Sequence, residues 1–431
     1  MAIGAVVILS VVVAWLIAYL LPRSRKKGVM PFTFSNNEKF SFIAVNHCFS
    51  YVKAEAQLSD GTWVLPKLPT GIDKVWASWI GTIRLERLTS ANLILLRRVS
   101  SSKPEILDDE HKELFQEVMT LFWLLQLSGV VQYGGASAVQ GSFHGGDVNI
   151  RQMVQLEDYY PTEGSPRYPV TIERLEEAGQ MSAVWRELRK KNTHARFRRG
   201  ARILRDGLEM RVGQDRQREF TRSIEALIRP DPYKTTKQFK TRAQTLGVRN
   251  KKSEEILYES YEMRCDVEHV HEWDRFLQKY PEDERLAIAN MRTRQMEALA
   301  RESYRRILLN AKIRAHFESD DTLNDFWVLP FGEQRKIWGP GIDVTGFRTP
   351  TNSRRRSGRS SNVMRETCLE SEASGVIADR SAVADATLAT QWRRRLRLLL
   401  RQCLPLPDGE VLRDRLLVQR LQSSCRRGKR E

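Results

Sequence analysis

The chain has 431 residues, of which 70 are Lys or Arg and 53 are Asp or Glu, so its net charge is +17. This length predicts two or three domains, and a hydrophobic content of 41% is enough for ordinary cores. The five cysteines are scattered and form no C-x-x-C pair, which argues against a disulfide framework and a zinc site. The positive charge favours a polyanionic partner, although residues 350–431 contribute about half of it.

The chain begins with an uncharged apolar segment, residues 2–21. As a helix it would span about 30 Å, the thickness of a bilayer core. We therefore predict a transmembrane anchor, with a cleaved signal peptide and a misassigned start codon as the alternatives. The positive-inside rule predicts a single-pass protein of the inner (cytoplasmic) membrane with its soluble part in the cytoplasm. The cations that would contact anionic lipid are Arg23, Arg25, Lys26 and Lys27.

Residues 31–190 are predicted to form a mixed α/β domain of unknown role. Its first part, 31–105, is typical of short strands and turns, with an apolar run at 41–45 and an Asp60-Gly61 turn. Trp76 and Trp79 fit the same interpretation.

A buried helix is predicted over 109–127, because acidic residues begin it and apolar residues recur at helical spacing. The glycine-rich stretch from Gly134 to Gly146 matches no phosphate-binding motif, so loops and hairpin turns are predicted there.

Helical patterns dominate from Val170 to Asn310, and the prolines Pro230 and Pro232 interrupt them once. Residues 350–431 form a basic, low-complexity tail that is predicted to be disordered. Within that tail, residues 391–401 have the pattern of a short basic amphipathic helix.

A dense basic run lies at 187–205, with Phe197 among the cations. Nucleic-acid contact is one interpretation, because cations bind phosphates and bases stack on aromatic rings. A solvated helix face that covers a core is the other. The candidate contact residues are Arg189, Lys190, Arg196, Arg198, Arg199 and Arg202.

Arg264 and His269 form an R-x4-H pair. Arginine can hold a phosphate, and histidine can take the proton of a ribose 2′-hydroxyl near neutral pH. On a straight helix the two side chains would lie about 140° apart, so one helix does not aim both at one phosphate. The structural alternative is local pairing of Arg264 with Glu268 and of His269 with Asp266. Arg189 and His194 show the same spacing.

The region around this pair resembles the HEPN superfamily (higher eukaryotes and prokaryotes nucleotide-binding), particularly its ApeA-like branch. The resemblance covers about residues 195–310. It is carried by Ile224-Glu225-Ala226-Leu227-Ile228, by Phe239-Lys-x-Arg242, and by the helix Leu257-x-x-x-Tyr261-x-x-Arg264…His269.

This resemblance implies an up-and-down bundle of about four helices, commonly dimeric, and an RNase activity that needs no metal or other cofactor. Many members act in anti-phage or toxin–antitoxin systems. The family's catalytic pair would fall on Arg264 and His269, facing its twin across the dimer. Active members usually carry Asn, Asp or His after the arginine, where this chain has Cys265 followed by Asp266.

The expected fold class is therefore α+β: an N-terminal transmembrane helix, a mixed α/β domain (31–190), a HEPN-like helical domain (195–340) and a basic tail (350–431). The leading hypothesis is a membrane-tethered endoribonuclease that acts on RNA as a homodimer, with Glu225 and Asp266 supporting the pair. The alternatives are a non-catalytic nucleic-acid-binding or dimerisation module at the membrane, and a helical domain that only organises partners.

Overall fold

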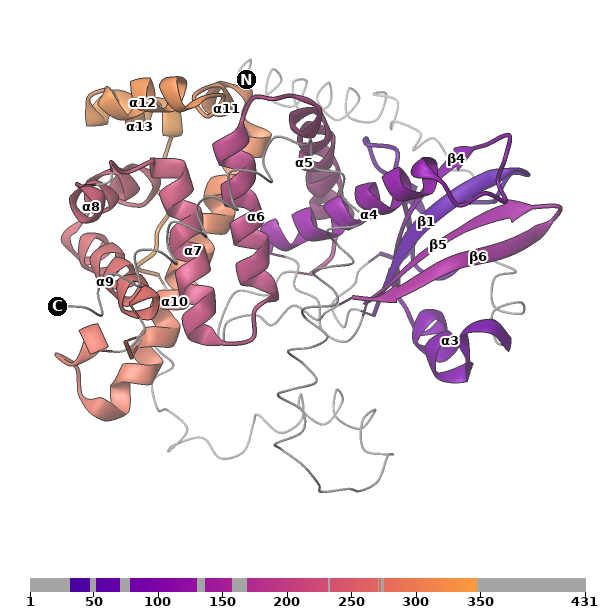
Figure 1. Cartoon of the computed structure of the whole chain (residues 1–431), viewed down its shortest axis with the longest axis horizontal. Coiled ribbons are helices and arrows are strands. Elements are labelled where there is room, and N and C mark those ends of the chain that lie inside the picture. The colour runs from indigo at the N-terminus through magenta and orange to yellow at the C-terminus, as the bar shows by residue number, and fades with distance from the viewer. Residues whose placement is uncertain are drawn as a thin grey trace, which may run out of the picture. The chain divides into compact units, whose positions relative to one another are not determined.

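The computed structural model describes residues 32–46, 52–69, 78–129, 136–156, 169–231, 233–269, 271–272 and 275–346. Its class is α+β: an antiparallel sheet with its helices comes first along the chain, and further helices follow (Figure 1). The strands are β1 (Glu38–Val45), β2 (Ala56–Gln57), β3 (Trp63–Leu65), β4 (Leu93–Ser100), β5 (Ala136–His144) and β6 (Asp147–Gln155). The helices beside the sheet are α3 (Thr82–Thr89) and α4 (Asp109–Leu127).

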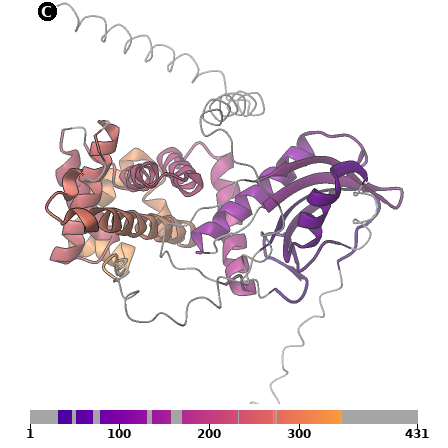
Figure 2. The ribbon, with the colours of Figure 1, turned by 90° about the horizontal axis from the view of Figure 1, so that it is seen from below.

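The second half of the described chain is helical. Its α-helices are α5 (Ile172–Lys190), α6 (Ala195–Glu209), α7 (Gly213–Ile228), α8 (Thr235–Leu246), α9 (Lys251–Glu268), α10 (Glu282–Leu309), α11 (Ala311–Ala315), α12 (Asp320–Val328) and α13 (Phe331–Trp338). A short 3₁₀ helix, η1 (Arg275–Leu277), precedes α10. The long α10 runs across this part of the molecule (Figure 2), where it contacts α5, α7 and α9.

The sheet has the strand order β2-β3-β4-β1-β5-β6, with β1 paired to β4 and β5. Successive residues of a strand point to opposite faces, so Phe40 and Phe42 join one buried cluster and Ile43 and Val45 join another. All eight residues of β1 are buried because both faces are covered. Helix α4 lies against one face, and α3 contributes Leu88 to the cluster on the other (Figure 1).

The turn between β5 and β6 is made by Gly145 and Gly146. Their φ values are 65° and 86°, left-handed conformations that glycine adopts at little cost. A bulge next to Gly141 interrupts the register of the two strands. The predicted hairpin is therefore confirmed, while Gly134 and Gly135 lie outside the described residues.

Helix α4 begins and ends where the sequence predicts. Asp108 caps its first turn by accepting hydrogen bonds from backbone N–H groups, that of Glu110 at 3.1 Å. The Lys39 ammonium on β1 is buried between Asp108, at 2.5 Å, and Glu110, at 2.8 Å. These bonds offset the cost of burying a lysine and attach the start of α4 to the centre of the sheet.

The chain breaks between α7 and α8, as the prolines predict. Arg229 takes a left-handed conformation after α7, with a φ of 44°. Arg242 of α8 donates hydrogen bonds to the carbonyl oxygens of Ile228 and Arg229, at 3.0 and 2.7 Å. The last carbonyl oxygens of a helix have no hydrogen-bond donor within that helix, and here the Arg242 side chain supplies one.

A buried charge network links the helices to α4. Glu297 of α10 binds Arg216 of α7 at 3.2 Å and Arg301 at 3.0 Å. Arg301 also donates to the carbonyl oxygen of Gln126 in the last turn of α4. One continuous apolar cluster includes residues of the sheet, of α4 and of the later helices, so the predicted domains 31–190 and 195–340 share a core.

The predicted transmembrane helix is not found, and this element of the fold class is corrected. None of the described helices is long and apolar enough to cross a bilayer. Helix α10 has the length, but it carries charged side chains throughout. Residues 2–21, the four cations that follow them and the tail 350–431 lie outside the described residues. The predicted single-pass location in the inner membrane is withdrawn with the helix.

Candidate functional site

Helix α9 places Arg264 beside α7. The side chain of Asn250 caps the start of α9 by accepting from the N–H of Ser253. Ile256, Leu257 and Tyr261 are buried in the shared core, so the orientation of the helix is fixed by packing. Arg264 follows one turn after Tyr261 on the side that contacts α7, and its side chain is 18% exposed.

Two carboxylates bind the guanidinium of Arg264. Glu225 of α7 lies 3.0 Å from Nη2, and Glu268, one turn further along α9, lies 2.9 Å from Nη1. Burial raises the pKa of Glu225 even though Arg264 pulls it down. Burial alone would lower the pKa of Arg264. The negative charges of Glu225 and Glu268 have the larger combined effect and raise this pKa above its ordinary value. Arg264 is therefore a permanent cation held by a carboxylate from another helix.

His269 ends α9 and is exposed. Its backbone N–H donates to the carbonyl oxygen of Cys265 at 3.0 Å and so caps the last turn of the helix. The ring centroid lies 6.5 Å from that of His271. Among the described residues, no bond joins His269 to Asp266 or to Arg264. The angular separation of about 140° expected on one helix argues that a single protomer does not direct both groups at one phosphate.

The predicted basic contact residues divide into bound and exposed groups. Arg196 makes two hydrogen bonds to Asp320, at 2.6 and 3.0 Å, and Arg189 donates to Gln116 at 2.6 Å. Arg198 is half-buried, whereas Lys190, Arg199 and Arg202 are exposed. Phe197 is buried in the core and cannot stack on a base. The exposed cations of α6 thus remain available to a polyanion, but the aromatic residue predicted beside them does not.

The start of α8 lies against α9 next to this site. The Tyr261 hydroxyl lies beside the side chains of Thr235 and Thr236, and its ring is 4.9 Å from that of Phe239. Burial raises the pKa of Tyr261. The connection between α7 and α8 therefore lies at the same end of the helices as Arg264. It contains Tyr233, which the sequence reasoning missed although the proline break marked the place.

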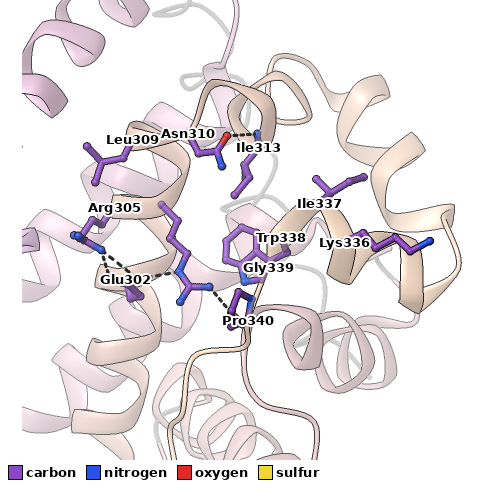
Figure 3. Close-up of a pocket in the computed structure, with 11 residues that line it drawn as sticks. Glu302, Arg305, Leu309, Asn310, Ile313, Lys336, Ile337, Trp338, Gly339 and Pro340 are labelled. Carbon is purple, nitrogen blue, oxygen red and sulfur yellow. Dashed lines mark hydrogen bonds and ion pairs between the residues drawn. The ribbon is translucent and has the colours of Figure 1, made fainter. Parts of the chain in front are cut away.

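A shallow pocket of about 470 Å³ lies between α10, α11 and α13 (Figure 3). Its cations are already bonded: Arg305 to Glu302 at 3.1 Å, and Arg306 to Glu302 at 2.8 Å and to the carbonyl oxygen of Pro340. Its floor includes Trp338, whose Nε1 donates a hydrogen bond to the carbonyl oxygen of Leu246. Leu246 is the last residue of α8, at the opposite end of that helix from the threonines beside Tyr261. None of the predicted site residues lines this pocket.

Within the described ranges, no group of three or more His, Cys, Asp and Glu side chains could hold a metal ion. No family model, curated protein or solved structure matches the chain. The resemblance to the HEPN superfamily thus stays a prediction from the quoted motifs.

Proposed function

We propose that this chain is a HEPN-like endoribonuclease that cleaves RNA as a homodimer without a metal. The observation that supports this best is the division of roles at the end of α9. Arg264 is a fixed cation, held by Glu225 from a neighbouring helix, and His269 is an exposed imidazole. Cleavage through the ribose 2′-hydroxyl needs one group that holds the phosphate and one that moves a proton.

In this proposal the scissile phosphate replaces Glu268 on Arg264. The Arg264–Glu268 pair is an i,i+4 contact whose carboxylate is 32% exposed. Of the two carboxylates on Arg264 it is the more exposed, so it is the one that an incoming anion can displace. Glu225 is only 14% exposed and stays in place. It acts as a positioning residue for Arg264.

His269 accepts the proton of the 2′-hydroxyl while the O2′–phosphorus bond forms and the phosphorus–O5′ bond breaks. The leaving O5′ oxygen takes a proton from the imidazolium or from water. The products are a 2′,3′-cyclic phosphate and a 5′-hydroxyl. Because helical spacing would separate the side chains of Arg264 and His269, the proposal has the imidazole that serves a given arginine come from a second copy across the dimer.

The test incubates the purified full chain with single-stranded RNA in EDTA and measures 2′,3′-cyclic phosphate ends. We expect His269→Ala to reduce cleavage at least about 100-fold, the usual effect of losing a general base. His271→Ala is the matched control, because it removes the neighbouring exposed imidazole, and it should cleave like the wild type. Equal cleavage by the wild type and by His269→Ala would refute the proposal that the chain is an endoribonuclease.

A second candidate is non-catalytic RNA binding, and it is favoured by the occupation of Arg264 by two carboxylates. It predicts RNA binding that survives His269→Ala and that weakens with salt, because phosphate contacts release counterions. Neutralising Arg199 and Arg202 together should weaken binding and flatten its salt dependence. Neutralising Arg196, which is bound to Asp320, should change it less.

A further inference from the structure

Tyr233 is the most exposed large hydrophobic side chain in the described part of the chain, with 99% of its surface open to solvent. It lies in the turn between α7 and α8. The carbonyl oxygen of Asp231 accepts from the N–H of Lys234 at 3.0 Å, and the Asp231 carboxylate accepts from Gln238 at 2.7 Å. A tyrosine outside the core gives up about 2 kcal/mol of burial free energy, and both faces of its ring are open to a ligand.

Two exposed cations follow Tyr233 along the chain. Lys234 and Lys237 are exposed, and no ion pair is described for either of them. Lys240, one turn further on, is bound to Glu254 at 3.4 Å and lies over the ring of Tyr258. The turn therefore presents a flat aromatic ring beside two available ammonium groups.

This turn adjoins the candidate site. Thr235 and Thr236 begin α8 directly after it, and both lie beside Tyr261, one helical turn before Arg264. A strand of RNA whose phosphate reached Arg264 would therefore pass close to Tyr233. A protein partner would favour apolar residues around the tyrosine as the centre of an interface, whereas the exposed residues near it include Lys234 and Lys237.

We infer that Tyr233 is a stacking platform for an unpaired RNA base, and that Lys234 and Lys237 contact the phosphates beside it. The inference rests on the proposed function and specifies its substrate as single-stranded RNA. Stacking on an aromatic ring is open to any unpaired base, because every base has a π face. Bases inside a duplex are stacked on one another and cannot bind in this way.

Binding is tested with the full chain carrying His269→Ala, which separates binding from cleavage. Fluorescence anisotropy compares a single-stranded RNA with a duplex that contains it. We expect Tyr233→Ala to weaken binding of the single strand about 5- to 150-fold, the range for one stacked base, and to change duplex binding little. Tyr233→Phe should bind like the parent. Trp79→Ala, which removes an exposed aromatic residue before α3, is the matched control.

The lysines are tested by salt dependence. Changing Lys234 and Lys237 to Gln together should reduce the slope of log affinity against log salt by about 1.4 for a single strand. The inference fails if Tyr233→Ala binds single-stranded RNA as the parent does, if Tyr233→Phe loses as much as Tyr233→Ala, or if the chain binds no RNA. If Tyr233→Ala weakens binding of single-stranded RNA but the wild type does not cleave RNA, the stacking role of Tyr233 is supported and the proposed catalysis is refuted.

Discussion

Arg264 has two acidic partners that differ in burial, and the difference gives them different roles. Glu225 reaches it from α7 and is largely buried, so an amide there would leave the guanidinium without its buried counter-ion. Glu268 is more exposed and also lies 4.0 Å from Arg222. Losing its charge would leave each of these arginines with one acidic partner fewer, while Glu225 still binds Arg264 and Glu219 still binds Arg222. In the proposed mechanism the first carboxylate supports RNA binding and the second competes with it.

We therefore expect opposite effects of Glu225→Gln and Glu268→Gln. Glu268→Gln should tighten RNA binding about two- to fivefold at low salt, as expected for removing one exposed anion. Glu225→Gln should lower cleavage at least tenfold and lower the free energy of unfolding by about 1–3 kcal/mol, because it leaves a half-buried charge poorly paired. Anisotropy, cleavage rates and urea unfolding measure these effects. Weaker RNA binding by Glu268→Gln would argue against displacement of that carboxylate.

Among the elements, the crossing of α6 and α7 depends on small residues. Gly200 of α6 lies so close to α7 and α10 that a Cβ there would overlap the Tyr304 hydroxyl and lie 2.6 Å from the Cβ of Ala226. The Tyr304 hydroxyl cannot easily move aside, since it donates to the carbonyl oxygen of Ser223 at 2.8 Å. Helix α7 carries Glu225, so this close packing also positions the candidate site.

Gly200→Ala should destabilise the protein by about 1–3 kcal/mol, because forced overpacking outweighs the gain of about 1 kcal/mol in helix propensity. Gly332→Ala is the matched control: it is also a helical glycine, in α13, and a Cβ there meets no atom within 4 Å. The control should be neutral or slightly stabilising. Thermal unfolding followed by circular dichroism compares the two. Equal stability of the two variants would mean that α6 and α7 do not approach as closely as described.

The sequence predicts local elements better than their arrangement. Helix α4 could be placed to the residue because its acidic start and apolar period are local signals. The helix Thr82–Thr89 was missed within a region expected to form strands, since it buries only Leu88. The strand order follows from pairing of β1 with strands far along the chain, which no local pattern encodes.

The candidate site shows the same limit. Helical spacing alone predicts the contact of Arg264 with Glu268. The contact with Glu225 crosses between two helices, and only the family resemblance pointed to it. Tyr233 carried no sequence signal beyond the proline break, because exposure is a property of the folded chain.

At the scale of the whole molecule, the sheet and the helices are joined by charges as well as by a shared apolar core. Arg301 contacts both sides of this junction, binding Glu297 within α10 and the last turn of α4 through the Gln126 carbonyl. Arg305, on the next turn, binds Glu177 of α5 at 2.8 Å. A cation at the end of α4 also interacts favourably with the negative end of the helix dipole.

Arg301→Ala should therefore act on the whole fold. It removes one cation from the buried Glu297 and leaves the Gln126 carbonyl without that donor, so we expect a loss of about 3 kcal/mol in the free energy of unfolding. Lys336→Ala, which breaks an exposed pair with Glu333, should cost less than about 0.5 kcal/mol. Urea unfolding should be followed by tryptophan fluorescence and by circular dichroism. Because the two parts share a core, both signals should shift together in Arg301→Ala, and separate transitions in the wild type would contradict that coupling.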